Sequence, residues 1–165
     1  LLTVTRAFIA VPLPESIRAN LLELDRSEQG ISWSFPDRWH ITIQFFENAD
    51  MGQLERLFCQ IEAQEAVGSL GPRVSRLGKQ ILMVPVDGLS DVAEEVRTAT
   101  ASHGSHDQLP FVGHITLGRM KETDSAEIEG TPIEGVFRAD RLLLVESRID
   151  SGGHAHTVVD SRPLL

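Results

Sequence analysis

Two tetrapeptides in this chain nearly repeat each other, and they constrain its fold more than any other feature. Residues 40–43 read His-Ile-Thr-Ile, and residues 114–117 read His-Ile-Thr-Leu. Each lies in an apolar run typical of a β-strand, where side chains two positions apart share a face. We therefore expect His and Thr to stand side by side on each strand, and the isoleucine between them to point into a core.

Strand-like and helix-like runs alternate along the 165 residues, which predicts an α+β fold with helices covering one face of each sheet. The motif histidines lie 74 positions apart, so we expect residues 1–165 to form a single domain made of two similar lobes. A break is expected at 68–71 and a loop or short helix at 121–135. Helices are expected to start near 14, 50 and 90, and strands are expected at 4–11, 31–35, 39–46, 73–77, 80–86, 111–120, 142–145 and 157–159.

The net charge of −9 limits the classes of partner. Proteins that grip a long nucleic-acid backbone usually carry a basic surface, so we do not expect tight binding to duplex DNA. A small phosphate held by a few local donors is compatible with this charge. No apolar run is long enough to cross a membrane and no secretory signal is recognisable, so we expect a cytoplasmic monomer without a membrane partner. The single cysteine, Cys59, excludes an internal disulfide and a cysteine-rich zinc site.

The repeated motif supplies the groups that acid–base chemistry on a phosphodiester needs. One group must take a proton from the nucleophile and another must give a proton to the leaving oxygen, and imidazole suits both roles near neutral pH. The hydroxyls of Thr42 and Thr116 can donate to non-bridging phosphate oxygens. Such a site requires no metal, no cofactor and no covalent intermediate.

The motif pair resembles the signature of the 2H phosphoesterase superfamily, which is named for two His-x-Thr/Ser-x motifs. Within it the chain is most similar to the RNA 2′,3′-cyclic phosphodiesterase family of bacteria and archaea, historically called 2′-5′ RNA ligase. The similarity extends through nearly the whole chain. Matching segments lie at 6–14, 33–46, 111–119, 146–147 and 152–153.

The resemblance implies a bilobal, pseudo-symmetric fold in which two antiparallel sheets form a V-shaped cleft, with helices on the outer faces. It implies hydrolysis of the 2′,3′-cyclic phosphate of an RNA end or nucleotide to a 2′-phosphomonoester. His40 would be the proton donor and His114 the proton acceptor. Thr42, Thr116 and Arg119 would bind the substrate.

The chain departs from the family pattern at two places. Gly113 stands before the second motif where the family usually has proline, and we expect it to loosen the start of that strand and change how the histidine is aimed. The family often has an aromatic residue, commonly tyrosine, near the last strand. Here residues 153–156 read Gly-His-Ala-His, so a stacking or hydrogen-bonding contact would be missing or replaced.

Several side chains near the motifs are open to two interpretations. Gln44 is expected on the same strand face as His40 and Thr42, where it could bind ligand or water. Phe8 and Phe45 could line the cleft, although core packing is the more frequent role of phenylalanine. Arg119 has an odd spacing from the second motif, so a perfectly regular strand would turn it away from the site. Arg38 and Lys79 are further cationic candidates whose ordinary role is a solvated charge.

Three other functions remain open from the sequence. The same site could join RNA halves in a reversible 2′-5′ ligation, or bind nucleotides and RNA ends without turnover. A metal hydrolase could use His154 and His156, because two imidazoles two positions apart on a strand can reach one ion. His103 and His106 form a similar pair, but no further ligand cluster accompanies either pair.

Overall fold

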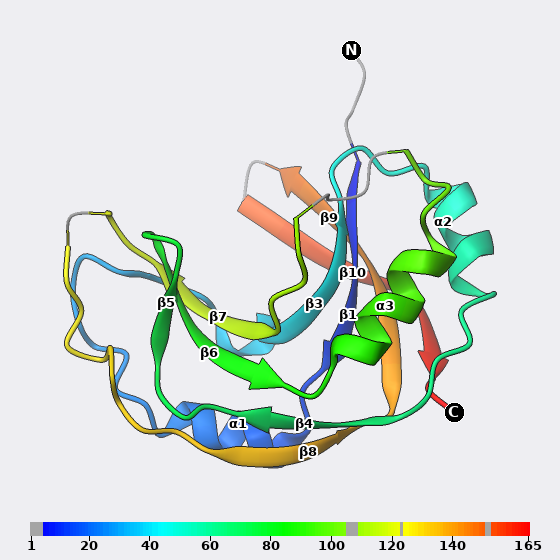
Figure 1. The fold of residues 1–165 in the computed structure, drawn as a ribbon. Helices are drawn as coiled ribbons and strands as arrows, with labels where there is room; N and C mark the ends of the chain where they lie inside the picture. The colour runs from blue at the N-terminus through cyan, green and yellow to red at the C-terminus, as the bar shows by residue number, and fades with distance from the viewer. Residues whose placement is uncertain (1–4, 105–108, 123, 151–152) are drawn as a thin grey trace.

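The computed structural model describes residues 5–104, 109–122, 124–150 and 153–165. The described residues form three α-helices. Figure 1 shows them packed around a strongly curved array of strands. In chain order the elements are β1 (Arg6–Pro12), α1 (Glu15–Leu22), β2 (Ser32–Trp33), the 3₁₀ turn η1 (Pro36–Arg38), β3 (His40–Phe46), α2 (Met51–Phe58), β4 (Ala66–Leu70), β5 (Ser75–Leu77), β6 (Ile81–Asp87), α3 (Ser90–Ala99), β7 (His114–Arg119), β8 (Gly135–Ala139), β9 (Arg141–Asp150) and β10 (Gly153–Pro163).

The strands follow the order β10-β9-β1-β3-β7-β6-β4-β8, with β2 beside β7 and β5 beside β6, and the pairings are antiparallel. The pairing between strands is shortest in the middle of the array, where β3 and β7 pair through Ile41 and Ile115. Two halves diverge from this junction: β10, β9, β1 and β3 on one side, and β7, β6, β4 and β8 with β2 and β5 on the other (Figure 1). The antiparallel α+β fold expected from the sequence is confirmed, and its two sheets are joined edge to edge by the two motif strands.

The isoleucine of each motif anchors its strand in the main core, as the alternation of side chains predicts. Ile41 and Ile115 are fully buried, and so are Ile43 and Leu117 at the last position of each motif. Burying one such side chain stabilises the fold by about 1.5–3 kcal/mol. This burial fixes which face of each strand remains for His and Thr.

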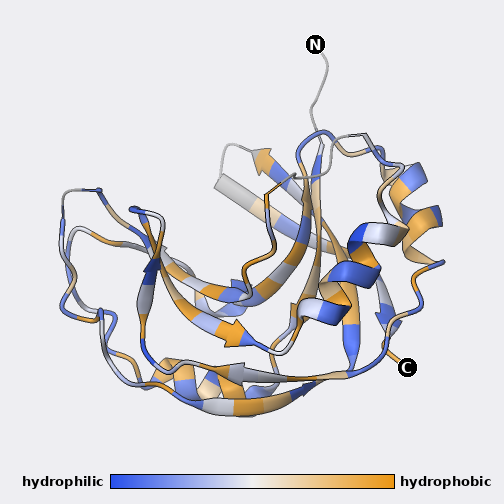
Figure 2. Ribbon diagram, in the orientation of Figure 1, coloured by the Kyte–Doolittle hydropathy of each residue, from blue (hydrophilic) through white to orange (hydrophobic). Residues whose placement is uncertain are grey.

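Helices α1 and α3 each pack against the half of the strand array that does not contain the strand preceding them in sequence. Helix α3 follows β6 but packs on β3, where the Arg97 guanidinium donates to the Ile43 carbonyl oxygen at 3.3 Å. Helix α1 follows β1 but packs beside β8, where the Asn20 amide donates to the Glu134 carbonyl oxygen at 3.1 Å. Figure 2 shows both hydrophobic and hydrophilic residues along α3, as expected for a helix with one buried side. The exchange of helices interlocks the two halves.

Both motif strands contain an irregularity at the same motif position. On β3 the register with β1 skips Ile43, and on β7 the register with β6 skips Leu117. In each strand a β-bulge therefore follows the motif threonine directly. Because a bulge adds one residue, side chains beyond it exchange faces relative to a regular strand.

Two local expectations from the sequence need correction. The break expected at 68–71 lies partly inside β4, because Gly68 is a strand residue paired with Phe137. A Cβ at Gly68 would lie 2.5 Å from the Phe137 ring, so glycine serves close packing here. Strand β8 follows directly after the expected loop at 121–135 and was not anticipated. By contrast, α2 begins as predicted, with the Asp50 carboxylate accepting from the Gln53 amide at 3.1 Å.

None of the helices among the described residues is long and apolar enough to cross a membrane.

Candidate active site

The two motif histidines are held in the same way by the main chain. Nδ1 of His40 donates to the Arg38 carbonyl oxygen at 2.6 Å, and Nδ1 of His114 donates to the Val112 carbonyl oxygen at 2.7 Å. A carbonyl oxygen only accepts, so each contact assigns the proton of the neutral ring to Nδ1. Nε2 is then the nitrogen of each ring that can accept a proton or, once protonated, donate one.

The strand pairing relates the two motifs by a local pseudo-twofold axis. Because Ile41 pairs with Ile115 in antiparallel register, continuing that register sets His40 opposite Thr116 and Thr42 opposite His114. Within the first motif, Oγ1 of Thr42 lies 2.9 Å from Nε2 of His40, and the hydroxyl donates to this nitrogen in the neutral ring. Each imidazole therefore has a hydroxyl on its own strand and another across the junction.

Both His–Thr couples line one cavity of about 520 Å³, a volume within the usual range for small-molecule sites. None of the described residues lining it is Asp or Glu, although the chain carries a net charge of −9. The lining combines arginines, histidines, hydroxyls and aromatic rings, which suits a phosphate ester attached to a ring system. These residues are Ser32, Trp33, Ser34, Phe35, Arg38, His40, Thr42, His114, Thr116, Arg119 and His156.

The bulge on β7 explains why Arg119 lines the cavity despite its odd spacing. Leu117 is the residue added by the bulge, so Arg119 returns to the face that carries His114 and Thr116. The guanidinium is thereby brought to the same cavity as the motif. A sequence interpretation based on regular alternation would turn this side chain away.

The bulge on β3 has the opposite consequence for Gln44, whose expected position was wrong. Gln44 pairs with Ile9, a residue of the main core, and is only 2% exposed. Its side-chain amide donates to the Phe45 carbonyl oxygen at 3.1 Å, and it does not line the cavity. Phe45 takes the place beyond the bulge that faces the cleft side, where it packs against Phe8.

The ring of His40 is enclosed by two other rings. Phe8 stacks on it with centroids 4.6 Å apart and planes inclined by 13°, and the edge of His156 approaches with centroids 6.1 Å apart. Burial lowers the pKa of His40 from 6.5 to about 4, against the opposing effect of the Arg38 carbonyl. The nearby imidazoles of His156 and His114 contribute to this lowering of the His40 pKa. In the protein alone His40 is therefore neutral at pH 7.

Some cavity residues were missed because they come from segments that carry no recognisable motif. Phe35 lies just before η1 with 68% of its surface exposed, and the Arg38 guanidinium lies 5.7 Å from its ring centre. His156 is exposed, as expected, but it also lines the cavity from β10, in the segment where the sequence left a family contact missing or replaced. An exposed aromatic residue five positions before the first motif strand is no signal by itself. Only the strand arrangement brings these residues together.

The sequence suggests that Gly113 loosens the start of β7. In the structure this glycine instead allows a close main-chain contact there. Its carbonyl oxygen accepts from the Val86 amide at 2.9 Å. A Cβ at this position would lie 2.2 Å from the Val86 carbonyl oxygen, so no larger residue fits without moving the strand. The close contact fixes the main chain next to His114.

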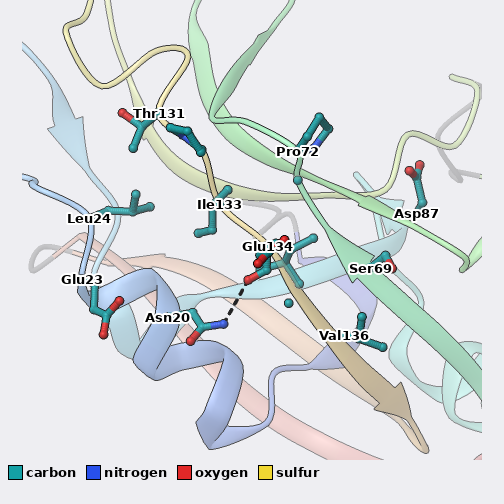
Figure 3. A pocket seen from close by; sticks show the side chains of 14 residues that line it. Asn20, Glu23, Leu24, Ser69, Pro72, Asp87, Thr131, Ile133, Glu134 and Val136 are labelled. Carbon is teal, nitrogen blue, oxygen red and sulfur yellow. Dashed lines mark hydrogen bonds between the residues drawn. The ribbon is translucent and has the colours of Figure 1, made fainter.

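A separate and larger hollow of about 1220 Å³ lies between α1 and the β4–β8 pair (Figure 3). Figure 3 shows Glu23, Asp87 and Glu134 among its side chains, and the dashed line is the bond from Asn20 to the Glu134 carbonyl. None of the described residues lining it is a histidine, lysine or arginine. Its acidic lining makes it a poor phosphate site, whatever its size.

The described part of the chain contains no cluster of three or more His, Cys, Asp or Glu side chains arranged for a metal ion. His106, one member of the histidine pairs noted in the sequence, lies outside the described residues, and so does the side chain of His154. His103 is buried instead, where its Nε2 accepts from the Asp50 amide at 3.1 Å.

No family model matches this chain. It is 25% identical to a Thermotoga maritima protein named RNA 2′,3′-cyclic phosphodiesterase, over 93% of this chain and 92% of the relative. A Methanocaldococcus jannaschii protein of the same name is 20% identical, over 93% of this chain and 98% of the relative.

The structure is similar to that of Escherichia coli LigT in its apo form, with a TM-score of 0.80, 21% identity and 99% of both chains covered. LigT complexed with 3′-AMP gives a TM-score of 0.77 and 22% identity, covering 97% of this chain and 98% of that one. These similarities extend over both halves of the strand array and establish the fold.

Proposed function

We propose that the chain is a 2H phosphoesterase that hydrolyses the 2′,3′-cyclic phosphate of RNA ends or nucleotides to a 2′-phosphomonoester, as its similarity to the two curated relatives and to LigT supports. One observation carries the proposal: two His–Thr couples, related by a local pseudo-twofold axis, line a cavity without described carboxylates. The names of the two relatives supply the substrate class. The 3′-AMP bound to LigT supports a nucleotide as the ligand.

In the proposed reaction, water attacks phosphorus opposite the 3′ oxygen, and Nε2 of His114 accepts a proton from that water. The new P–O bond forms as the bond between phosphorus and the 3′ oxygen breaks, and Nε2 of His40 gives its proton to the leaving oxygen. The products are a 2′-phosphomonoester and a free 3′ hydroxyl. Thr42, Thr116 and Arg119 stabilise the charge on the non-bridging oxygens.

The donor role of His40 requires that substrate binding protonate this ring. His40 is neutral at pH 7 in the protein alone, because its pKa is about 4. An anionic phosphate beside the ring favours the charged form and raises this pKa. Proton uptake would therefore accompany binding, and the acid would be formed only when a phosphate is present to use it.

The identity of the product tests the proposal. We expect the purified protein to convert adenosine 2′,3′-cyclic phosphate into adenosine 2′-monophosphate with a chelator present throughout. The ³¹P NMR spectrum identifies the product. Release of the 3′-monophosphate, or binding of the nucleotide without any product, would contradict it. Addition of an RNA with a 5′ hydroxyl tests for ligation, because that hydroxyl would then replace water as the nucleophile.

Several expectations of the sequence stay predictions. They are that residues 1–165 act as one catalytic domain of two similar lobes, that no metal or cofactor takes part, and that the protein is a cytoplasmic monomer. It also stays a prediction that the protein binds neither duplex DNA nor membranes.

A further inference from the structure

His156 occupies a position that the proposed two-histidine reaction does not use. Its ring lies edge-on to Phe8, with centroids 5.1 Å apart, and edge-on to His40 at 6.1 Å. It lines the candidate site together with both motif couples. It also lines an adjoining hollow of about 540 Å³ whose apolar wall includes Val145 and Val158. The ring thus stands at the boundary between the candidate site and a second hollow with an apolar wall.

The strand register fixes the direction of this side chain. His156 pairs with Ser147 on β9, and Ser147 pairs in turn with Arg6 on β1. Side chains paired across antiparallel strands share a face, so His156 lies on the face that carries Phe8. Its arrival at the cavity follows from the pairing of β10 with β9 and does not depend on a loop conformation.

We propose that His156 is a third functional imidazole of this site, which in its protonated form donates to a non-bridging oxygen of the bound phosphate. The inference rests on the proposed function, because it assigns a further substrate contact within that site. His156 would bind the phosphate and take no proton from the nucleophile. Its charge would strengthen substrate binding at mildly acidic pH and contribute little above the ordinary pKa of imidazole.

The charged groups around His156 are compatible with this role. His40, His114 and two arginines, Arg38 and Arg119, line the same cavity. Arg6 is paired with Ser147, the residue that His156 pairs with from the other side. The additional positive charge of His156 is unfavourable beside these groups until an anion is present, so its protonation and anion binding are coupled.

Three carboxylates lie near the same elements without entering the cavity. Asp37 lines the adjoining hollow of about 540 Å³. Glu146 lies on the other face of β9, where its carboxylate accepts from Arg148 at 2.9 Å. Asp160 lies further along β10, where Cys59 Sγ is 3.8 Å from its carboxylate. None of them belongs to the described lining of the candidate site, so a phosphate bound there would meet no carboxylate of that lining.

The test measures binding of adenosine 2′,3′-cyclic phosphate, whose charge is the same at about pH 5.5 and about pH 8, below and above the ordinary imidazole pKa. Calorimetry uses the His114→Ala background, which the proposed mechanism leaves without turnover. We expect His156→Gln to weaken binding about tenfold at the lower pH and less than twofold at the higher pH. We expect His156→Lys, which keeps a positive charge, to bind tightly at both.

Steady-state kinetics in the otherwise unchanged protein separate this role from a structural one. His156→Gln should raise KM at low pH and leave kcat nearly unchanged, whereas Thr157→Ala, on the opposite face of β10, should change neither. If His156→Gln matches an active wild type in KM and affinity at both pH values, the inference fails and the proposed function stands. If His156→Gln loses the same affinity at both pH values and His156→Lys does not restore it, His156 serves only packing and the inference is overturned. A wild type that hydrolyses nothing would overturn the proposed function itself.

Discussion

At the scale of single residues, each motif histidine has one ring nitrogen fixed by the main chain and one directed to chemistry. The Nδ1 contacts of His40 and His114 with the carbonyl two residues earlier set both the ring orientation and the neutral tautomer. Phe8 then covers one face of the first ring and shields that face from water. The two rings therefore share an anchor but differ in their surroundings, which gives a physical basis for different roles.

The burial of His40 predicts a stability change with pH. Its pKa in the folded protein is about 4, below the value of 6.5 that the unfolded chain has. As the pH falls through this window the unfolded state takes up the proton first, so the free energy of unfolding decreases. Because the side chain is only half-buried, we expect a contribution of about 1–3 kcal/mol.

Urea unfolding at several pH values between these limits measures this contribution. His40→Gln should lose less stability than the wild type on acidification, by that same amount, and Thr157→Ala should behave as the wild type. Imidazole NMR resonances report the pKa directly. Parallel pH dependence of the wild type and His40→Gln would contradict the assignment.

At the scale of secondary-structure elements, main-chain contacts aim the motif strands. The start of β7 is fixed by the approach of Gly113 to Val86, and a bulge follows the motif threonine in both β3 and β7. The bulges let His, Thr and one residue beyond them share the cleft face. A regular strand would place that last residue on the other face.

Gly113→Ala tests the role of the close contact. A methyl group here would meet the Val86 carbonyl oxygen at 2.2 Å, so the start of β7 must shift. We expect a loss of about 1–3 kcal/mol in the free energy of unfolding and a lower kcat, because His114 moves with the strand. Gly104→Ala is the matched control, since nothing lies within 4 Å of a Cβ there. Wild-type kcat and stability in Gly113→Ala would show that the contact does not aim the strand.

The elements that could be predicted from the sequence are those whose signal is local. The strand of each motif follows from alternating apolar residues, and the start of α2 follows from the capping side chain of Asp50. The bulges could not be predicted, because they depend on how β1 and β6 pair with the motif strands. For the same reason Gln44 was assigned to the wrong face, and Gly68 was interpreted as a break although it makes room for Phe137.

At the scale of the whole molecule, the strand order concentrates positive and neutral donors in one cavity of an acidic protein. The motif couples could be predicted from the sequence because each is contiguous and repeated. Phe35 and His156 could not, because the segment before η1 and β10 contribute them separately, and for Phe8 of β1 the sequence left a cleft role and a core role open. The halves meet at Ile41 and Ile115, and this single pairing converts two separate motifs into one candidate site.

The charge distribution predicts that Arg119 contributes binding more than catalysis. It is an arginine in a cavity whose described lining lacks carboxylates, so its removal should weaken attraction for a phosphate. We expect Arg119→Ala to raise KM for adenosine 2′,3′-cyclic phosphate about tenfold with a small effect on kcat, and Arg119→Lys to recover part of the loss. Lys79→Ala is the control. That exposed lysine forms an ion pair with Glu122, with an N–O distance of 2.8 Å, and it does not line the cavity. Equal KM values for Arg119→Ala and the wild type would remove Arg119 from the substrate contacts.

The central claim is that His40 and His114 act together on a cyclic phosphate, and its most direct test is the hydrolysis rate of the two single variants. With adenosine 2′,3′-cyclic phosphate and a chelator present, the account predicts that His40→Ala and His114→Ala each lose about 10²–10⁴ in kcat while both remain folded by circular dichroism. Either variant hydrolysing the nucleotide within twofold of the wild-type rate, or a wild type that the chelator inactivates, would contradict it.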